Sequence, residues 1–338
     1  MYARVAVRHR IRSRLESLLP EAGNADGVKP GGFAVALRRA FRSGYDGKAL
    51  RADLLAGLVV GIVAVPLSMA LANAVGASPQ NGLYTAIIAG GIAALAGGSK
   101  FQITGPTAAF VVILEPIVAK HGLRGLLLAG LMAGFMLIGM GVAKLGRLIQ
   151  FIPYPVTTGF TAGIAWVIAS LQLKDALGLR LPRVDHPPES YVEKMRFFWE
   201  HRGTAQLADV AVAAATVALL LLVPKLTKRI PAPLIVVTVV SLAAFAAERL
   251  VPGLHVSKVP AIPRMPPTPM LPWEGQPLTF AAVQSLVPSA FAIAMLGAIE
   301  SLLSAVIADG MTGKRHDPNG ELIGQGLANV AAPFFGGI

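Results

Sequence analysis

The feature that most constrains this chain is a series of long apolar stretches between residues 54 and 338. About nine are present, and several approach the roughly 20 residues that a helix needs to cross about 30 Å of hydrocarbon. Since 54% of the 338 residues are hydrophobic and only 14% are charged, these stretches cannot all be buried in a water-soluble core. We expect helices rather than a β-barrel, because no alternating pattern is present. The predicted spans are 54–75, 82–98, 106–119, 125–143, 156–173, 207–223, 231–247, 280–308 and 322–338.

The distribution of basic residues predicts how these spans are oriented. The formal net charge is +12, but the basic residues are not gathered on one element with interleaved aromatics, so a nucleic-acid partner is not expected. They lie at the ends of the apolar stretches, which predicts a cytoplasmic N-terminus in a multi-pass protein of the bacterial inner membrane. The basic groups are the region 1–50, Lys144 with Arg147, Lys225 with Lys228 and Arg229, and Lys314 with Arg315, while Lys120 and Arg124 fall on the opposite side.

Two segments without long apolar stretches connect the spans. The stretch 174–206 carries charges of both signs and is predicted to be an external loop with a short helix over 191–201. The stretch 251–279 contains many prolines, so we predict an extended external connector. Cysteine is absent and the six histidines lack metal-ligand spacing, so no metal centre of those types is expected. We predict neither an enzyme nor an organic cofactor, because no nucleophile-elbow or phosphate-loop motif occurs.

The third predicted span is too short to cross a bilayer alone. From Pro106 it offers about 14 residues, or roughly 21 Å of helix. The preceding residues 100–105 alternate between polar and apolar, which predicts a short strand, and Pro106 suits the first position of a helix. We therefore expect a strand that leads into a half-helix, which is tolerated at membrane depth only where it lines a cavity or is buried in protein.

An internal repeat supports this interpretation. Pro79, Leu83 and Gly97-Gly98 have the same spacing as Pro318, Leu322 and Gly336-Gly337. Inverted repeats are the usual architecture of transporters with broken helices, although such a sparse match also arises by chance in a Gly-rich chain. Because the sequence ends one residue after the second glycine pair, we expect a second half-helix beyond it and a second repeat that is incomplete here.

The start of the predicted half-helix is a candidate anion site. Thr104, Gly105, Pro106, Thr107 and Ala108 combine backbone N–H groups, the positive end of a helix dipole, hydroxyls and small side chains. These features suit an anion. The alternative is an ordinary helix start with a Thr cap.

Glu300 is a candidate coupling residue. It is the only carboxylate deep inside a long predicted span, and Ser304 lies one turn further on the same face. An ionised Glu there is costly, so we expect it to face the bundle interior, carry a proton or meet a cation such as Na⁺. The alternative is a packing residue that is hydrogen-bonded between helices. Asp53, Asp209, Asp309 and Glu321 lie at span ends and are expected to be solvated, as is Glu115.

Five motifs are distributed along the chain. They are Asp53-Leu-Leu-Ala-Gly-Leu-Val-Val-Gly-Ile-Val-Ala-Val-Pro66, Ser78-Pro-Gln-Asn-Gly-Leu-Tyr84, Gln102-Ile-Thr-Gly-Pro-Thr107, Ile299-Glu-Ser-Leu-Leu-Ser304 and Asp317-Pro-Asn-Gly-Glu321. Together they resemble the sulfate permease (SulP) family of anion transporters, from about residue 50 to the end of the sequence.

The resemblance implies an all-α membrane protein with fourteen segments in two inverted halves of seven. It divides the chain into a cytoplasmic region 1–50, a first repeat 51–250, the connector 251–279 and the start of a second repeat 280–338; the cytoplasmic STAS domain of the family is absent from the sequence. It also implies that an anion lies between the third and tenth segments, near Thr107, with Leu67 and Leu71 contributing from the first. The positions that match Glu300 and Ser304 bind Na⁺ in the bicarbonate branch of the family.

The sequence departs from the family pattern at two places. Leu67 stands where many members have Gln, and Asn81 stands where an aromatic residue is common. The first departure removes a donor from the implied site and leaves the substrate open.

We therefore expect secondary transport of a small inorganic or carboxylate anion by alternating access, with Thr107 at the anion and Glu300 coupling it to H⁺ or Na⁺. The lipid bilayer is an expected partner and a homodimer is a possible one. The alternatives are a passive channel or exchanger in which Glu300 is structural, an inactive fragment of such a carrier, and an uncharged-nucleobase carrier of the same architecture.

Overall fold

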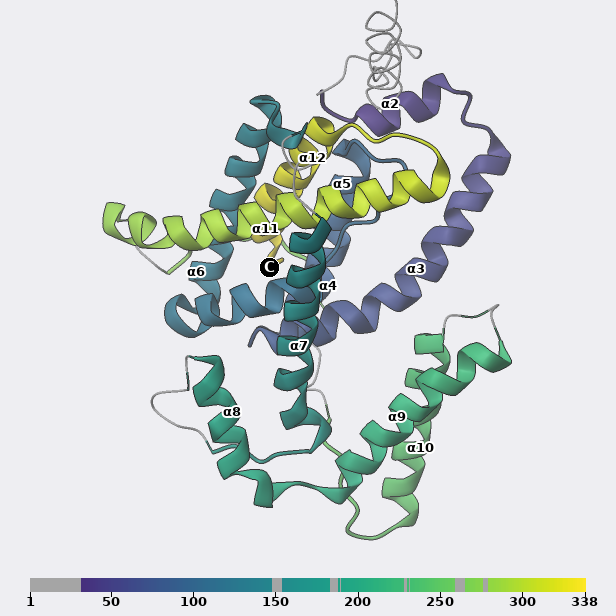
Figure 1. The fold of residues 1–338 in the computed structure, drawn as a ribbon, viewed down its shortest axis with the longest axis vertical. Coiled ribbons are helices and arrows are strands. Elements are labelled where there is room, and N and C mark those ends of the chain that lie inside the picture. Colours follow the sequence, from purple (N-terminus) through teal and green to yellow (C-terminus); the bar gives the residue numbers. More distant parts are fainter. Residues whose placement is uncertain are drawn as a thin grey trace, which may run out of the picture.

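The structure is a computed structural model that describes residues 32–147, 154–182, 188, 190–227, 230, 232–258, 265–275 and 279–338. All regular elements within these ranges are helices (Figure 1). This confirms the prediction of an all-helical protein.

The first two predicted spans form helices. A short helix, α2 (Val35–Arg42), precedes α3 (Gly47–Ala74), which begins where the Asp46 side chain accepts a 2.8 Å hydrogen bond from Ala49 N. The second span is continuous but changes type: α4 (Pro79–Tyr84) passes into the π-helix η2 (Thr85–Ala89) and then α5 (Gly90–Ala96). A π-helical turn is uncommon and occurs frequently at functional sites.

The third and fourth spans lie in one element, α6 (Ala108–Val142), which is broken at Gly122. Gly122 has φ 68° and ψ 177°, a conformation that favours glycine, so residues 108–121 form the short helix expected from the sequence. Two details of the prediction are wrong. Helix α6 begins at Ala108 rather than Pro106, and residues 100–105 form no strand, because no neighbouring strand is described that would complete a ladder with them.

The connections agree with the prediction where they are described. Helix α8 (Tyr191–Glu200) lies within 174–206 and begins with a capping box between Ser190 and Glu193. Residues 265–275 contain no helix, as expected for a proline-rich connector. The remaining helices are α7 (Tyr154–Ala176), η4 (Arg202–Thr204), α9 (Leu207–Leu226), α10 (Ala232–Leu250), α11 (Phe280–Thr312), α12 (Pro318–Ala331) and η5 (Ala332–Phe335).

The core forms where α6 packs against α11 and α12. Leu137, Leu302 and Leu322 are fully buried there. Helices α6 and α12 approach closely because glycines face each other: a Cβ added at Gly134 would lie 2.8 Å from Gly326 O, and one added at Gly326 would lie 2.7 Å from Gly134 O. Small residues thus bring these two helices together, as is common in membranes.

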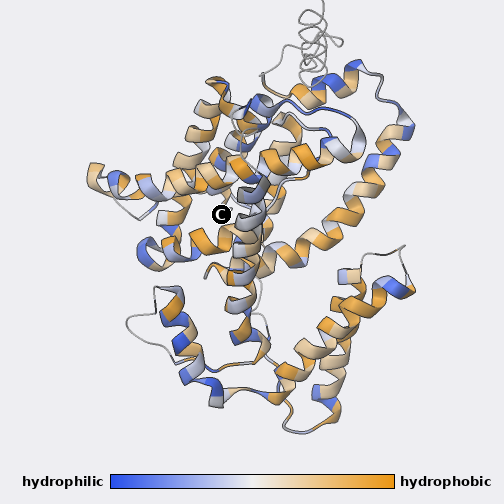
Figure 2. Ribbon diagram, in the orientation of Figure 1, coloured by the Kyte–Doolittle hydropathy of each residue, from blue (hydrophilic) through white to orange (hydrophobic). Residues whose placement is uncertain are grey.

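Within the part of the chain that the structure describes, five helices are long and apolar enough to cross a membrane: α3, α6, α9, α10 and α11. In α6 and α11 half of the most apolar window is buried, whereas in α3 and α10 only 6% is. Figure 2 shows apolar residues along the outer helices α3, α9 and α10. Such extensive exposed apolar surface is incompatible with water and fits contact with lipid, so the chain is a multi-pass membrane protein.

The two copies of the internal repeat pack against each other in opposite directions. The first copy is the continuous helix α4–η2–α5 and the second is α12–η5, and Pro79 and Pro318 occupy the first turn of each. The contacts are reciprocal. Glu321, near the start of the second copy, accepts a hydrogen bond from Gly98 N after the end of the first, and Asn81, near the start of the first, donates one to Gly336 O at the end of the second. The sparse sequence match is therefore a structural pair.

The glycine contact between α6 and α12 generates a prediction. Gly326→Ala places a methyl group against the α6 backbone and should destabilise the protein by about 1–3 kcal/mol. The matched control is Gly91→Ala in α5, where an added Cβ meets nothing within 4 Å; it should be neutral or slightly stabilising, by up to about 1 kcal/mol. Thermal unfolding in detergent measures both. Equal melting temperatures for the two variants would contradict this account of the contact.

Candidate functional site

The site begins at the start of α6, where Thr107 is the N-cap residue. Its side chain makes no capping hydrogen bond, so the interpretation of Thr107 as an ordinary Thr cap is wrong. Instead Thr107 Oγ1 is buried without a hydrogen-bond partner. A buried hydroxyl without a partner is costly and uncommon, and it marks a position where a ligand, ion or water is expected.

Glu300 of α11 faces this hydroxyl. Gly297, about one turn earlier on α11, packs on Phe110, since a Cβ added at Gly297 would lie 3.6 Å from Phe110 Cζ. Thr107 lies one turn before Phe110 on α6, and its hydroxyl interacts with the Glu300 carboxyl group. The two groups do not reach hydrogen-bond geometry, because both Thr107 Oγ1 and Glu300 Oε2 lack a partner. The structure thus brings together the two residues that the sequence analysis had singled out on different spans.

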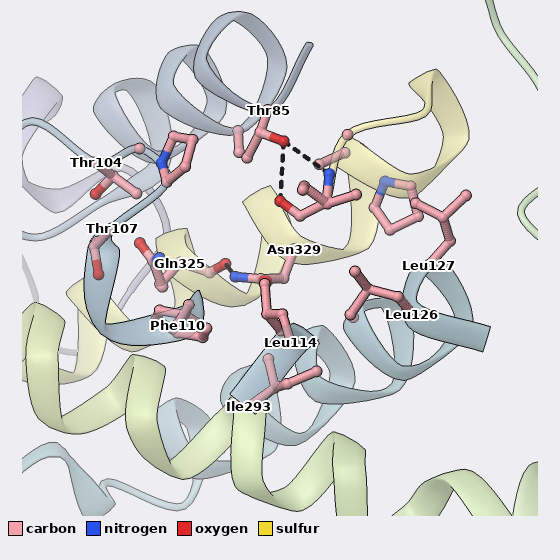
Figure 3. Close-up of a pocket in the computed structure, with 18 residues that line it drawn as sticks. Thr85, Thr104, Thr107, Phe110, Leu114, Leu126, Leu127, Ile293, Gln325 and Asn329 are labelled. Atoms are coloured by element: carbon pink, nitrogen blue, oxygen red, sulfur yellow. Dashed lines mark hydrogen bonds between the residues drawn. The ribbon is translucent and has the colours of Figure 1, made fainter. Parts of the chain in front are cut away.

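A cavity lies next to the start of α6. It has a volume of about 680 Å³, including the part open to solvent, and Thr104, Gly105, Pro106 and Thr107 form one wall. Figure 3 shows Thr107 and Phe110 on one side and Gln325 and Asn329 of α12 facing them. Leu114, Leu126, Leu127 and Ile293 supply apolar lining. Few polar groups in an apolar cavity are typical of a small-ligand site.

Sequence reasoning had not assigned Gln325 and Asn329 to the site. They lie four residues apart on α12, and both line the cavity. Gln325 Oε1 is buried without a partner, while Asn329 Nδ2 donates to the backbone oxygen of Gln325 at 2.9 Å. The signal that would have identified them is two amides four residues apart among the small and apolar residues of 322–331.

The other predicted site residues lie outside this cavity. Leu67 of α3 is 48% exposed, and Leu71 is partly buried against the core. Ala108 is partly buried, and Ser304 is exposed. Glu300 does not line the cavity; it lies beside Thr107, which does.

A buried network holds the segment that leads into α6. Glu321 Oε2 accepts hydrogen bonds from Gly98 N at 2.9 Å and Ser99 N at 3.0 Å, and Glu321 Oε1 accepts one from Ser301 Oγ at 3.2 Å. Gln102 Nε2 donates to the same Ser301 hydroxyl at 3.0 Å. The carboxylate therefore ties residues 98–102 to α11 and α12.

Three carboxylates expected to be solvated are placed differently. Glu321 is only 3% exposed and Asp209 only 5%; Asp209 accepts hydrogen bonds from Ser257 N and Ser257 Oγ. Glu115 forms an ion pair with Lys194 of α8. Contacts with segments distant in sequence, which local patterns do not reveal, override the expectation in each case.

The fold and site define a multi-pass membrane protein with paired inverted helices around a broken helix. The sequence profile of the Sulfate permease family matches residues 50–338. The chain therefore belongs to the sulfate permease family.

Curated relatives bear the names of transporters. The chain is 44% identical over 298 residues to the putative sulfate transporter YvdB of Bacillus subtilis, which covers 87% of this chain and 54% of that protein. It is 31% identical over 302 residues to the bicarbonate transporter BicA of a Picosynechococcus strain, covering 86% of this chain and 51% of that protein. The chain thus spans about half the length of the curated relatives it matches.

Solved structures agree with the fold. The transmembrane domain of a cyanobacterial BicA matches with a TM-score of 0.75 at 28% identity and covers 86% of this chain and 73% of that one. The murine Slc26a9 anion transporter in its inward-facing state also matches with a TM-score of 0.75, at 20% identity, over 90% of this chain and 53% of that one. The second likeness concerns the fold alone.

The Glu321 network generates a prediction. Glu321→Ala leaves the buried N–H groups of Gly98 and Ser99 without an acceptor, at a cost of about 1–3 kcal/mol for each group. The matched control is Glu200→Ala, which removes an exposed ion pair with Arg196 and should cost about 0.5 kcal/mol or less. Chemical or thermal unfolding in detergent measures the difference. If the two variants were equally stable, the network would not hold this segment.

Proposed function

We propose that the chain is the greater part of the transmembrane domain of a secondary anion transporter that works by alternating access in the bacterial inner membrane. One observation carries this proposal. At the start of the broken helix α6, the Thr107 hydroxyl lies beside the Glu300 carboxyl group, and Thr107 Oγ1 and Glu300 Oε2 are both buried without hydrogen-bond partners. Membership of the sulfate permease family supports it.

The start of α6 is proposed to bind the anion. The first turn of a helix leaves backbone N–H groups without partners inside the helix and carries the positive end of its dipole. Residues 104–107 bring this end to the wall of the cavity, and the amide of Gln325 lies on the opposite wall. The names of the relatives favour sulfate or bicarbonate as substrates. Small dicarboxylates are a third proposed class, which these names do not favour.

Glu300 is proposed to couple the anion to a cation. A lone carboxylate inside a membrane span is stabilised by a proton or a metal ion. Protonation would allow the carboxyl group to donate to Thr107 Oγ1, and Na⁺ would find hard oxygen ligands in the same two groups. Either cation would offset the charge of the anion that enters the adjacent site. Ser304, one turn further on α11, is the residue proposed to extend this site toward its exposed side.

Uptake by the full-length protein tests the function. Proteoliposomes should accumulate labelled sulfate, bicarbonate or a dicarboxylate when an inward H⁺ or Na⁺ gradient is imposed. Protein-free liposomes provide the background. Uptake of none of these anions under either gradient would overturn the proposed function.

Glu300→Gln tests the coupling. The variant keeps the shape of the side chain but cannot lose a proton or neutralise Na⁺, so gradient-driven accumulation should fall at least tenfold while anion exchange at equilibrium persists. Glu200→Gln, at an exposed position, is the control and should transport like the natural protein. Unchanged gradient dependence in Glu300→Gln would make this residue structural and favour the passive exchanger or channel.

Thr107→Val tests the binding site. The substitution is nearly isosteric and removes the unpartnered hydroxyl, so the KM for the anion or the coupling cation should rise about tenfold, as expected for loss of a hydrogen bond to a charged group. The control is Thr216→Val in α9, where the hydroxyl bonds only its own helix at Val212 O. Equal KM values for both variants would remove Thr107 from the site.

A further inference from the structure

A second cavity lies on the outer side of the segment that Glu321 holds. Its volume is about 630 Å³, including the part open to solvent. Three separate parts of the chain form it: helix α2, the residues that follow α5, and the end of α11 together with its connection to α12. Figure 1 shows α2 next to this yellow connection.

The cavity is strongly basic. Its cations are Arg39 from α2, Lys100 after α5, and Lys314 and Arg315 from the connection. One carboxylate, Asp309 near the end of α11, also lines it. That group already has a partner in His316, since it accepts a hydrogen bond from His316 N at 3.0 Å and pairs with His316 Nδ1 at 2.7 Å. Four cations against one carboxylate produce a positive potential that attracts an anion.

The position of the cavity fits a membrane surface. Helix α2 is docked on the core by Val35, which is fully buried, and by hydrogen bonds from Ala34 N to Ala96 O and from Ala36 N to Gly97 O. Phe33 and Phe41 at its ends are exposed, and α3 begins five residues after α2. A docked basic helix with exposed aromatics directly before a span is typical of the headgroup region.

We propose that the pocket bounded by Arg39, Lys100, Lys314 and Arg315 binds a phosphate group, carried either by an anionic lipid headgroup or by soluble phosphate. Arginine offers the paired donors that phosphate geometry suits, and lysine adds point charge. The cavity has room for one tetrahedral oxyanion, and its opening to solvent leaves space for a group attached to that oxyanion.

The ligand would also act on the segment leading into α6. Gly98 and Ser99 line this pocket with their outer side, while their N–H groups are held by Glu321 on the inner side. A phosphate group in the pocket would brace residues 98–101 from the face opposite to Glu321. This proposal does not depend on the transport function, because it concerns binding and stability.

The test measures retention of lipid by the full-length protein. Nanodiscs contain phosphatidylglycerol as a minor component in phosphatidylcholine, and native mass spectrometry gives the ratio of phosphatidylglycerol-bound to lipid-free protein. Arg39→Gln with Lys314→Gln should weaken retention about 25-fold, because each cation near an anionic surface contributes roughly fivefold. The charge-preserving pair Arg39→Lys with Lys314→Arg should retain most of the binding, which separates loss of charge from misfolding.

The matched control is Lys144→Gln with Lys225→Gln, which removes two cations on the same predicted side of the membrane but outside the pocket. It should change retention less than twofold. A second arm titrates inorganic phosphate onto protein in phosphatidylcholine alone and follows the melting temperature, which rises when a ligand binds the folded state.

The outcomes are distinct. Lipid retention that depends on Arg39 and Lys314 assigns the pocket to a headgroup. Phosphate-dependent stabilisation that depends on the same residues, without an effect on lipid retention, assigns it to soluble phosphate. If the pocket pair and the control pair behave alike in both arms, the proposal is wrong.

Discussion

The structure depends on one buried carboxylate that joins the two repeats. Glu321 lies in the first turn of α12 and accepts hydrogen bonds from the backbone of Gly98 and Ser99, where the first repeat helix has just ended. Those N–H groups have no helical partner, because helices leave backbone groups unsatisfied at their ends and residues 97–107 are irregular. Because residues 97–99 are buried, such groups require a partner from the protein. The irregular segment is therefore possible because a carboxyl oxygen from the other repeat reaches it and accepts both hydrogen bonds.

The consequences extend from that contact to the candidate site. Gln102 joins the same network through Ser301, and Ser301 follows Glu300 on α11. One set of hydrogen bonds thus positions both the segment before Thr107 and the helix that carries Glu300. Among the described residues, the buried side-chain oxygens without partners, on Gln102, Thr107, Glu300 and Gln325, lie around this junction rather than scattered through the core. The hydrogen-bonded network fixes the scaffold, while the neighbouring oxygens without partners stay available to a ligand. This arrangement is expected of a preformed binding site.

Sequence reasoning predicted what depends on length and periodicity. The apolar stretches predicted the helices, and the shortness of 106–119 predicted the short helix that Gly122 ends. The lone carboxylate in a long predicted span, Glu300, lies within α11, and its role stays a prediction. It failed where the outcome depends on a partner far along the chain. Glu321 is hydrogen-bonded to Gly98 and Ser99, more than 220 positions earlier in the chain, and Glu115 is paired with Lys194. The residues next to Glu321 and Glu115 in the sequence do not reveal these partners, so both side chains were expected to be solvated. Residues 100–105 have the alternation of a strand, but a ladder needs a second strand beside it. Gln325 and Asn329 acquire their place only when α12 packs against the start of α6.

The π-helical turn in the first repeat has a consequence for the register of the pair. Within η2, the Thr85 hydroxyl bonds both Ile338 N and Ile338 O, and one turn before it Asn81 bonds Gly336 O. A π turn holds one residue more than an α turn in the same length of helix. If Thr85–Ala89 formed a uniform α-helix with the same number of residues, everything before it would be rotated by about 100° relative to α5. Asn81 would then point away from the second repeat while Gly98 kept its place, so this extra residue sets the phase that allows both ends of the inverted pair to meet at once.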